Sequence, residues 1–199
     1  LVLSSLNLFS QGTPHVKVFS NFNYDLSADD NTNPFKSFEL KRAYLGYAHD
    51  LADKFNVQVT FDVGKNSAGS SYTTFLKIAA LNWKASDKLS LNFGMIGTKN
   101  FKFMEKTWGR RYIEKSALDK EKWANSADLG VSLDYKVLDN FTIDGQILNG
   151  EGYKNTQDVD GLMRVGFGGT YKLSNFSIRV FRDIKSCACS DINQEITTA

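Results

Sequence analysis

Apolar and polar residues alternate along much of this chain, in nine runs of about ten residues each. The clearest run is 55–63, where Phe, Val, Val, Phe and Val alternate with Asn, Gln, Thr and Asp. Because successive side chains of a β-strand point to opposite faces, this run has one apolar and one polar face. A tilted strand needs about ten residues to cross a bilayer, whereas strands of soluble sandwiches average about five or six. The pattern therefore predicts an all-β fold, an antiparallel transmembrane β-barrel.

These runs predict nine strands joined in a meander. Their ranges are Val16–Leu26, Phe38–His49, Phe55–Val63, Phe75–Ala85, Leu89–Thr98, Leu129–Val137, Phe141–Asn149, Leu162–Leu173 and Phe176–Arg182. Short polar turns alternate strictly with longer polar links. The long links are 27–37, 64–74, 99–128 and 150–161. Transmembrane barrels have this asymmetry, with short turns on the periplasmic side and longer loops outside.

Two of these runs are irregular. In 38–49 the alternation changes phase near Lys41 and Arg42, which predicts a β-bulge or a strand end outside the membrane. In 75–85 the phase places Lys77 on the face that we assign to lipid. A lysine near a long loop can extend its ammonium to the headgroups, so this position is compatible with a membrane strand.

Composition excludes some classes of protein. No stretch of the 199 residues reaches the roughly 18 continuous apolar residues of a membrane helix. A net charge of +2 gives no reason to expect a nucleic acid as partner. The aromatic content of 13% and the presence of only two prolines suit long paired strands. The lipid bilayer is therefore the first partner that we expect.

The two ends of the chain differ from its middle. Residues 1–11 are apolar and rich in Leu and Ser, and Gly-Thr-Pro follows, which predicts the remnant of a secretory signal peptide. We expect a partial barrel over 12–184 and a non-barrel tail over 185–199, in which Cys187 and Cys189 are incidental thiols. Nine strands is an odd number, whereas bacterial single-chain barrels have an even one. This count favours the front half of a longer barrel, or a chain altered by a frame error.

The longest link, 99–128, is rich in basic and aromatic residues, and we expect a short helix over 112–124, with Ile113 and Ala117 on one side. Loops longer than about 15 residues usually have a function, and in a wide barrel such a loop can fold inward and narrow the pore. Its basic residues would then favour anionic solutes. The candidate constriction and solute-facing residues are Lys102, Lys106, Arg110, Arg111, Lys115, Arg42 and Arg164. The alternatives are a solvated surface loop and a loop that binds an extracellular partner.

Signatures of catalysis are missing from the sequence. His15 and His49 lie in no metal-binding spacing, and there is no GxSxG elbow, P-loop or complete GxGxxG motif. We expect Asp62, Asp134 and Asp144 on polar, lumenal faces, where a catalytic pair is an alternative. The sequence therefore predicts a protein that is not an enzyme and that has no cofactor and no metal site.

Several phrases between Phe38 and Gly152 resemble a known family. They are FELKRAYLG at 38–46, LKIAALNW at 76–83, LSLNFGMIGTK at 89–99, DLGV at 128–131 and NGEG at 149–152. With the strand pattern, this part of the chain resembles the phosphate-selective porin O/P family of outer-membrane proteins, in the form seen in Bacteroidetes-type bacteria. The resemblance implies a pore of roughly sixteen to eighteen strands in the outer membrane of a Gram-negative bacterium. It also implies a homotrimer and passive diffusion of small anionic or polar solutes.

The chain departs from the family pattern after the fifth predicted strand. Family members commonly have Lys-Thr-Pro-Phe-Gly there, whereas this chain has Gly97-Thr98-Lys99-Asn100-Phe101-Lys102. The resemblance therefore implies a pore but does not carry over a preference for phosphate. The alternatives are a structural or adhesive outer-membrane barrel or anchor without a conducting pore, an outer-membrane enzyme, and a soluble β-sandwich.

Overall fold

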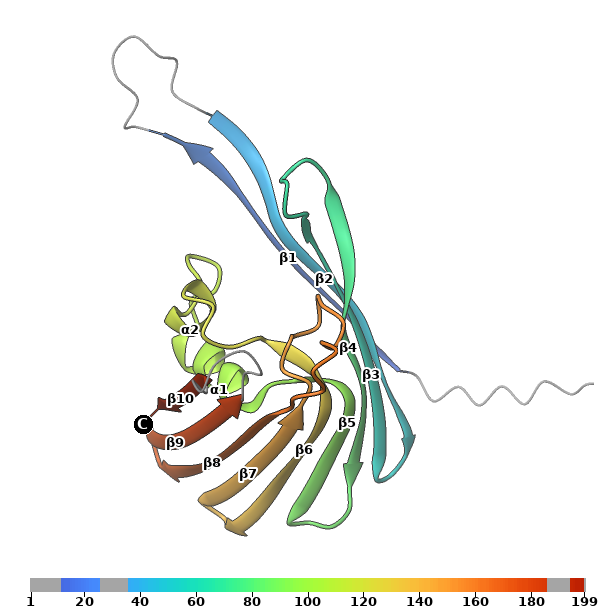
Figure 1. Cartoon of the computed structure of the whole chain (residues 1–199), viewed down its shortest axis with the longest axis vertical. Helices are drawn as coiled ribbons and strands as arrows, with labels where there is room; N and C mark the ends of the chain where they lie inside the picture. Colours follow the sequence, from blue (N-terminus) through green and yellow to red (C-terminus); the bar gives the residue numbers. More distant parts are fainter. Residues whose placement is uncertain (1–11, 26–35, 186–193, 199) are drawn as a thin grey trace, which may run out of the picture.

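The computed structural model describes residues 12–25, 36–185 and 194–198. In these residues ten strands form one sheet in the order of the chain, and each strand pairs antiparallel with the next. The sheet curves around a concave side on which two helices lie (Figure 1). This antiparallel meander confirms the predicted all-β class. The sheet is not closed, because β1 and β10 each have a paired neighbour on one side only among the described residues.

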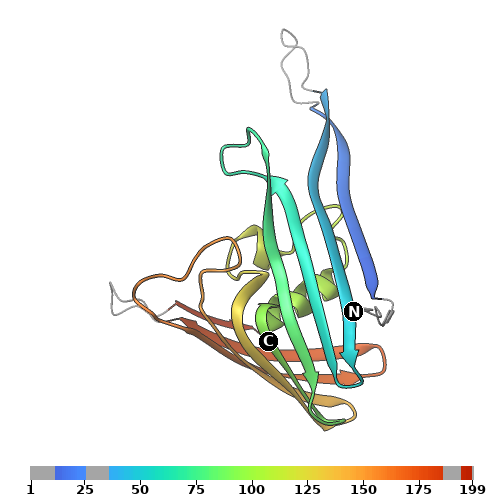
Figure 2. The ribbon, with the colours of Figure 1, turned by 90° about the vertical axis from the view of Figure 1, so that its right-hand side faces the viewer.

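The ten strands are β1 (Thr13–Tyr24), β2 (Lys36–Ala52), β3 (Phe55–Lys65), β4 (Tyr72–Lys84), β5 (Leu89–Gly97), β6 (Ala127–Leu138), β7 (Phe141–Leu148), β8 (Arg164–Leu173), β9 (Phe176–Lys185) and β10 (Gln194–Thr198). The first nine agree closely with the nine alternating runs. The helices α1 (Lys99–Trp108) and α2 (Ala117–Lys120) both lie in the link between β5 and β6. Short turns lie at one end of the sheet, and the links from β3 to β4, from β5 to β6 and from β7 to β8 lie toward the other, where β1 and β2 extend farthest (Figures 1 and 2).

The C-terminal region contains more strand than the sequence predicts. The sequence predicts no strand over 185–199, but β9 continues to Lys185 and the five residues of β10 pair with it. A run as short as Gln194–Thr198 shows no clear period of its own, and it forms a strand because the edge of β9 offers partners for its backbone. The predicted signal-peptide remnant, Cys187 and Cys189 lie outside the described residues.

The two faces of the sheet have opposite chemistry. Apolar side chains of the convex face are exposed, for example Leu133 at 41% and Phe167 at 56%. Polar side chains of the concave face are buried, for example Asp62 at 0% and Ser132 at 4%. Water-soluble proteins bury apolar residues and expose polar ones, so this reversed distribution is the one expected of a wall that faces lipid outside. Among the described residues, no helix is long and apolar enough to cross a membrane.

Two β-bulges explain the irregular runs. Phe19 of β1 is opposite Arg42 and Ser20 is opposite Leu40, which leaves Lys41 as the extra residue and confirms the bulge predicted there. In β4 the register likewise jumps from Ile78 to Leu76 and leaves Lys77 as the extra residue. Lys77 lies on the concave side, where its ammonium is 3.5 Å from the Tyr44 hydroxyl. Its assignment to the lipid face is therefore wrong, because the bulge changes the phase of the strand.

Gly94 marks a close approach of two strands. It has a φ of 100°, a conformation that residues with a Cβ rarely adopt. A Cβ at this position would lie 2.3 Å from the carbonyl oxygen of Ala79 in β4. The pairing of β4 with β5 therefore requires glycine here.

We expect Gly94→Ala to lower the free energy of unfolding by roughly 2–4 kcal/mol, because it combines a strained backbone with a backbone clash. Denaturant unfolding in detergent micelles, followed by tryptophan fluorescence, measures this change. Gly145→Ala is the matched control, since a Cβ at Gly145 has no neighbour nearer than 3.8 Å. Equal stability of the two variants would contradict this reading of Gly94.

Candidate functional site

The link between β5 and β6 enters the concave side of the sheet, as Figure 2 shows. α1 starts almost directly after β5, and the amide of Lys99 donates to Gln146 Oε1 of β7 at 3.0 Å. The Lys99 ammonium forms an ion pair with Asp134 of β6. Both partners belong to the polar inner face of the sheet, so the first turn of α1 is fixed to the wall.

The main helix of this link lies earlier than the sequence predicts. The expected helix over 112–124 is wrong for most of that range, since only α2 is helical there. α1 ends at Gly109, which has a φ of 64° and whose amide donates to the Glu105 carbonyl oxygen at 3.0 Å. Ile113, which the predicted helix places beside Ala117 on one face, is 64% exposed. The link therefore presents α1, rather than a later helix, to the wall.

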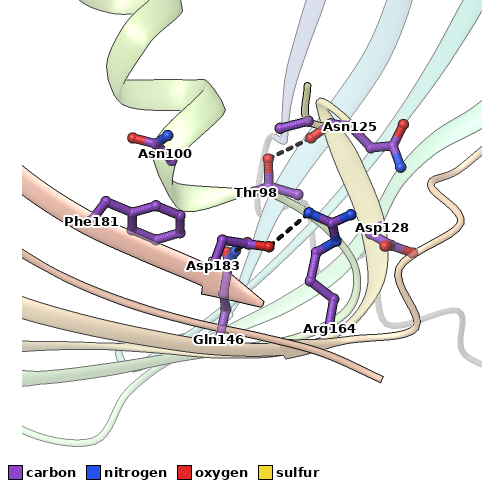
Figure 3. Close-up of a pocket in the computed structure, with 9 residues that line it drawn as sticks. Thr98, Asn100, Asn125, Asp128, Gln146, Arg164, Phe181 and Asp183 are labelled. Carbon is purple, nitrogen blue, oxygen red and sulfur yellow. Dashed lines mark hydrogen bonds and ion pairs between the residues drawn. The ribbon is translucent and has the colours of Figure 1, made fainter. Parts of the chain in front are cut away.

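A buried polar cluster holds both ends of the link at its root (Figure 3). Thr98 Oγ1 donates to the carbonyl oxygen of Asn125 at 2.6 Å. Arg164 Nη1 of β8 and Gln146 Nε2 donate to the two carboxylate oxygens of Asp183 in β9, at 2.7 and 3.2 Å. The cavity between these residues measures only about 10 Å³, which is about the space of one water molecule. The cluster is an anchor for the loop and is too filled to admit a larger solute.

Arg179 of β9 forms a second anchor. It donates to both carboxylate oxygens of Asp144 in β7, at 2.6 and 2.9 Å, and both side chains are at most 5% exposed. Its guanidinium lies 5.6 Å from the ring centre of Phe103 in α1 and 5.0 Å from that of Phe181. Gly168 leaves room for this arrangement, because a Cβ there would lie 2.9 Å from both Arg179 and Phe181. The ion pair thus supports α1 from the wall.

A cavity of about 440 Å³ lies between α1 and the strands β1, β2 and β4, and we call it the basic recess. Six cationic side chains line it, against the two carboxylates of Glu105 and Asp119. The cationic residues are Lys17, Arg42, Lys77, Lys102, Lys106 and Arg111. A concave surface with one prevailing sign of charge raises the local concentration of counter-ions, so the recess favours anions.

The two arginines of the basic recess are paired with carboxylates. Arg42 Nη1 lies 3.0 and 2.8 Å from the two carboxylate oxygens of Asp62 in β3. Arg111 lies 3.7 Å from Glu105 and 3.6 Å from Asp119. These arginines therefore largely offset the negative charge beside the recess.

Two of the four lysines of the recess lie over aromatic rings instead. Lys77 Nζ is 4.6 Å from the ring centre of Tyr44, and Lys17 Nζ is 5.0 Å from that of Phe19. Lys102 is exposed along part of its side chain, but loss of water around its ammonium and then a neighbouring lysine lower its pKa below the ordinary lysine value. Because both arginines are paired with carboxylates, the uncompensated positive charge of the recess comes mainly from its lysines.

The structure brings together four of the seven candidate residues, since those that line the basic recess are Arg42, Lys102, Lys106 and Arg111. Lys115 lines an adjoining cavity of about 440 Å³ that shares Arg42 and Arg111 with the recess. Arg110 is exposed and lines neither cavity, and Arg164 is buried in the anchor at the loop root.

Four further residues of this region are not among the candidates. Lys17 and Arg179 both occupy the polar phase of an alternating strand, and this phase is the signal that could have identified them. Lys77 could not be identified from its phase, because the bulge in β4 places it on the opposite face from the one that simple alternation predicts. Tyr153, which also lines the recess, lies in an irregular link that has no period to reveal it.

The described part of the chain contains no cluster of side chains suited to a metal ion. In residues 12–25, 36–185 and 194–198, no group of three or more His, Cys, Asp or Glu side chains is placed to hold a metal ion.

A curved wall of antiparallel strands, apolar outside and charged inside, with a loop on its inner side, defines the class of β-barrel porins. The family model described as phosphate-selective porin O and P matches residues 16–166, and the chain belongs to this family. None of the curated proteins compared with the chain matches it. The family is one of outer-membrane channels and not of enzymes, so membership implies a channel and an outer-membrane location.

We expect Asp144→Ala to lower the free energy of unfolding by about 3–5 kcal/mol, because it leaves the buried Arg179 guanidinium without its carboxylate. Denaturant unfolding in detergent micelles measures the loss. Asp139→Ala is the matched control, because Asp139 pairs with Lys136 at 2.9 Å but is fully exposed, and this variant should unfold like the wild type. A stable Asp144→Ala protein would show that the Arg179 pair is no anchor.

Proposed function

We propose that this protein is a pore of the outer membrane of a Gram-negative bacterium, through which small anionic or polar solutes diffuse passively. The observation that carries the proposal is the basic recess, which lies where α1 approaches the inner face of the wall. In the proposed pore α1 narrows the lumen, and the lysines beside it attract anions by their charge. Rings of basic side chains favour anions in pores in the same way.

The adjoining cavity supplies the proposed way in. It borders the recess at Phe19, Arg42 and Arg111. Three further cationic residues line it, Lys41, Lys65 and Lys115, against the carboxylates of Glu39 and Glu114. An anion would therefore meet positive charge before it reaches α1, and a graded positive surface raises the rate at which anions arrive.

The proposal names a class of solute and not phosphate. The word phosphate-selective describes the family, whereas the stretch 97–102 of this chain departs from the pattern expected after β5. The volume of about 440 Å³ and the mixture of lysines with aromatic rings suit anions of more than one size. The rival function is a structural or adhesive barrel without a conducting pore, and the absence of ohmic current in planar bilayers would favour it.

The double variant Lys102→Glu/Lys106→Glu should change the preference of the pore from anions toward cations, with a roughly fivefold fall in the chloride-to-potassium permeability ratio. The reversal potential of the full-length protein in planar bilayers under a KCl gradient measures this ratio.

The matched control is Arg110→Glu/Lys120→Glu, which makes the same change in net charge on the same loop but outside both cavities. We expect its reversal potential to stay close to that of the wild type. Equal shifts in both double variants would mean that only the overall charge matters, and an unchanged potential in both would place α1 outside the conduction path.

A further inference from the structure

Tyr153 belongs to the link between β7 and β8, yet its side chain reaches β3. Its hydroxyl donates to Asp62 Oδ2, a residue 91 positions earlier in the chain. Its amide donates to the carbonyl oxygen of Ala127 in β6 at 3.0 Å, which fixes the start of the link to the wall. Gly152 has a φ of 83°, and a Cβ there would lie 2.5 Å from the Asn125 side chain. The backbone before Tyr153 is therefore held in one tight conformation.

The ring of Tyr153 is held as firmly as its backbone. It meets the Phe75 ring edge-on, with ring centres 6.4 Å apart and an angle of 88° between the planes. The ammonium groups of Lys77 and Lys154 lie 5.4 and 5.8 Å from its ring centre. These contacts leave the hydroxyl directed at Asp62, because the ring has neighbours on several sides.

Asp62 is the carboxylate that this contact conceals. It is 0% exposed, although its partner Arg42 lines the basic recess. Arg42 donates to both of its oxygens, and Tyr153 donates to one of them. A carboxylate open to the recess would attract cations and oppose the lysines, whereas one that is buried and accepts from an arginine and a hydroxyl contributes little negative potential.

We propose that Tyr153 is a selectivity-determining residue of the pore, because it covers Asp62 and keeps this negative charge away from the anions that pass the basic recess. The role rests on the proposed function above and adds a second loop to it. The charge that a solute meets is then set both by the lysines near α1 and by one tyrosine of the β7–β8 link.

The test compares reversal potentials of the full-length protein in planar bilayers under a KCl gradient. Tyr153→Phe keeps the ring and removes the hydroxyl, so we expect a roughly twofold fall in the chloride-to-potassium permeability ratio. Tyr153→Ala also uncovers Asp62 and should lower the ratio further. Tyr135→Phe is the matched control: Tyr135 is on the convex face and 40% exposed, and this variant should behave like the wild type.

Repeating the measurement in the Asp62→Asn protein shows whether Tyr153 acts through Asp62. In that background Tyr153→Phe should leave the ratio unchanged, since no carboxylate remains for the lost hydroxyl to have held. An unchanged ratio for Tyr153→Phe in the wild-type background, or an equal fall in both backgrounds, would overturn the role of Tyr153. A wild-type protein without current would overturn the proposed function and this role with it, whereas an anion-selective wild type with unaffected variants would overturn this role alone.

Discussion

A wall of strands that faces lipid on its convex side leaves polar side chains only the concave side, and there each buried charge requires a partner. The arrangement of the interior follows from this constraint. Three buried aspartates of the inner face are each paired with an arginine, Asp62 with Arg42, Asp144 with Arg179 and Asp183 with Arg164. Because a guanidinium binds a carboxylate in a fixed geometry, these pairs determine where neighbouring rings and loops can pack.

The glycines of β8 make two contacts between β7 and β9 possible. Gly166 lies in register between Gln146 of β7 and Asp183 of β9, and the two side chains meet above it. Arg179 reaches from β9 across β8 to Asp144, which is in register with Gly168. A Cβ at Gly168 would lie 2.9 Å from Arg179, and one at Gly166 would crowd Gln146 and Asp183 at 3.0 and 3.1 Å, so the missing side chains of β8 allow β7 and β9 to interact directly. The anchor beneath α1 depends on this gap.

The sequence predicts the wall better than its interior because alternation is local and pairing is not. The run over 55–63 is sufficient to place β3, and the bulge at Lys41 is visible in the sequence as a break in the alternation. The bulge at Lys77 is not visible in this way. It lies close to a long loop, so too few strand residues precede it to show that the alternation has changed phase. α1 was missed because the Phe-Lys-Phe alternation at 101–103 is as typical of a strand as of a helix. Arg179 meets its carboxylate 35 residues away, beyond any local pattern.

The different partners of arginine and lysine explain how a densely charged interior keeps a positive recess. Arginine offers several donors in a rigid plane, and here Arg42 and Arg111 are held beside carboxylates. Lysine is a compact and strongly hydrated charge on a flexible stem, and Lys17 and Lys77 lie over aromatic rings. An anion that approaches such a lysine replaces water and a weakly held ring rather than a carboxylate. Paired arginines therefore maintain the shape of the recess, while its lysines remain available to anions in the proposed pore.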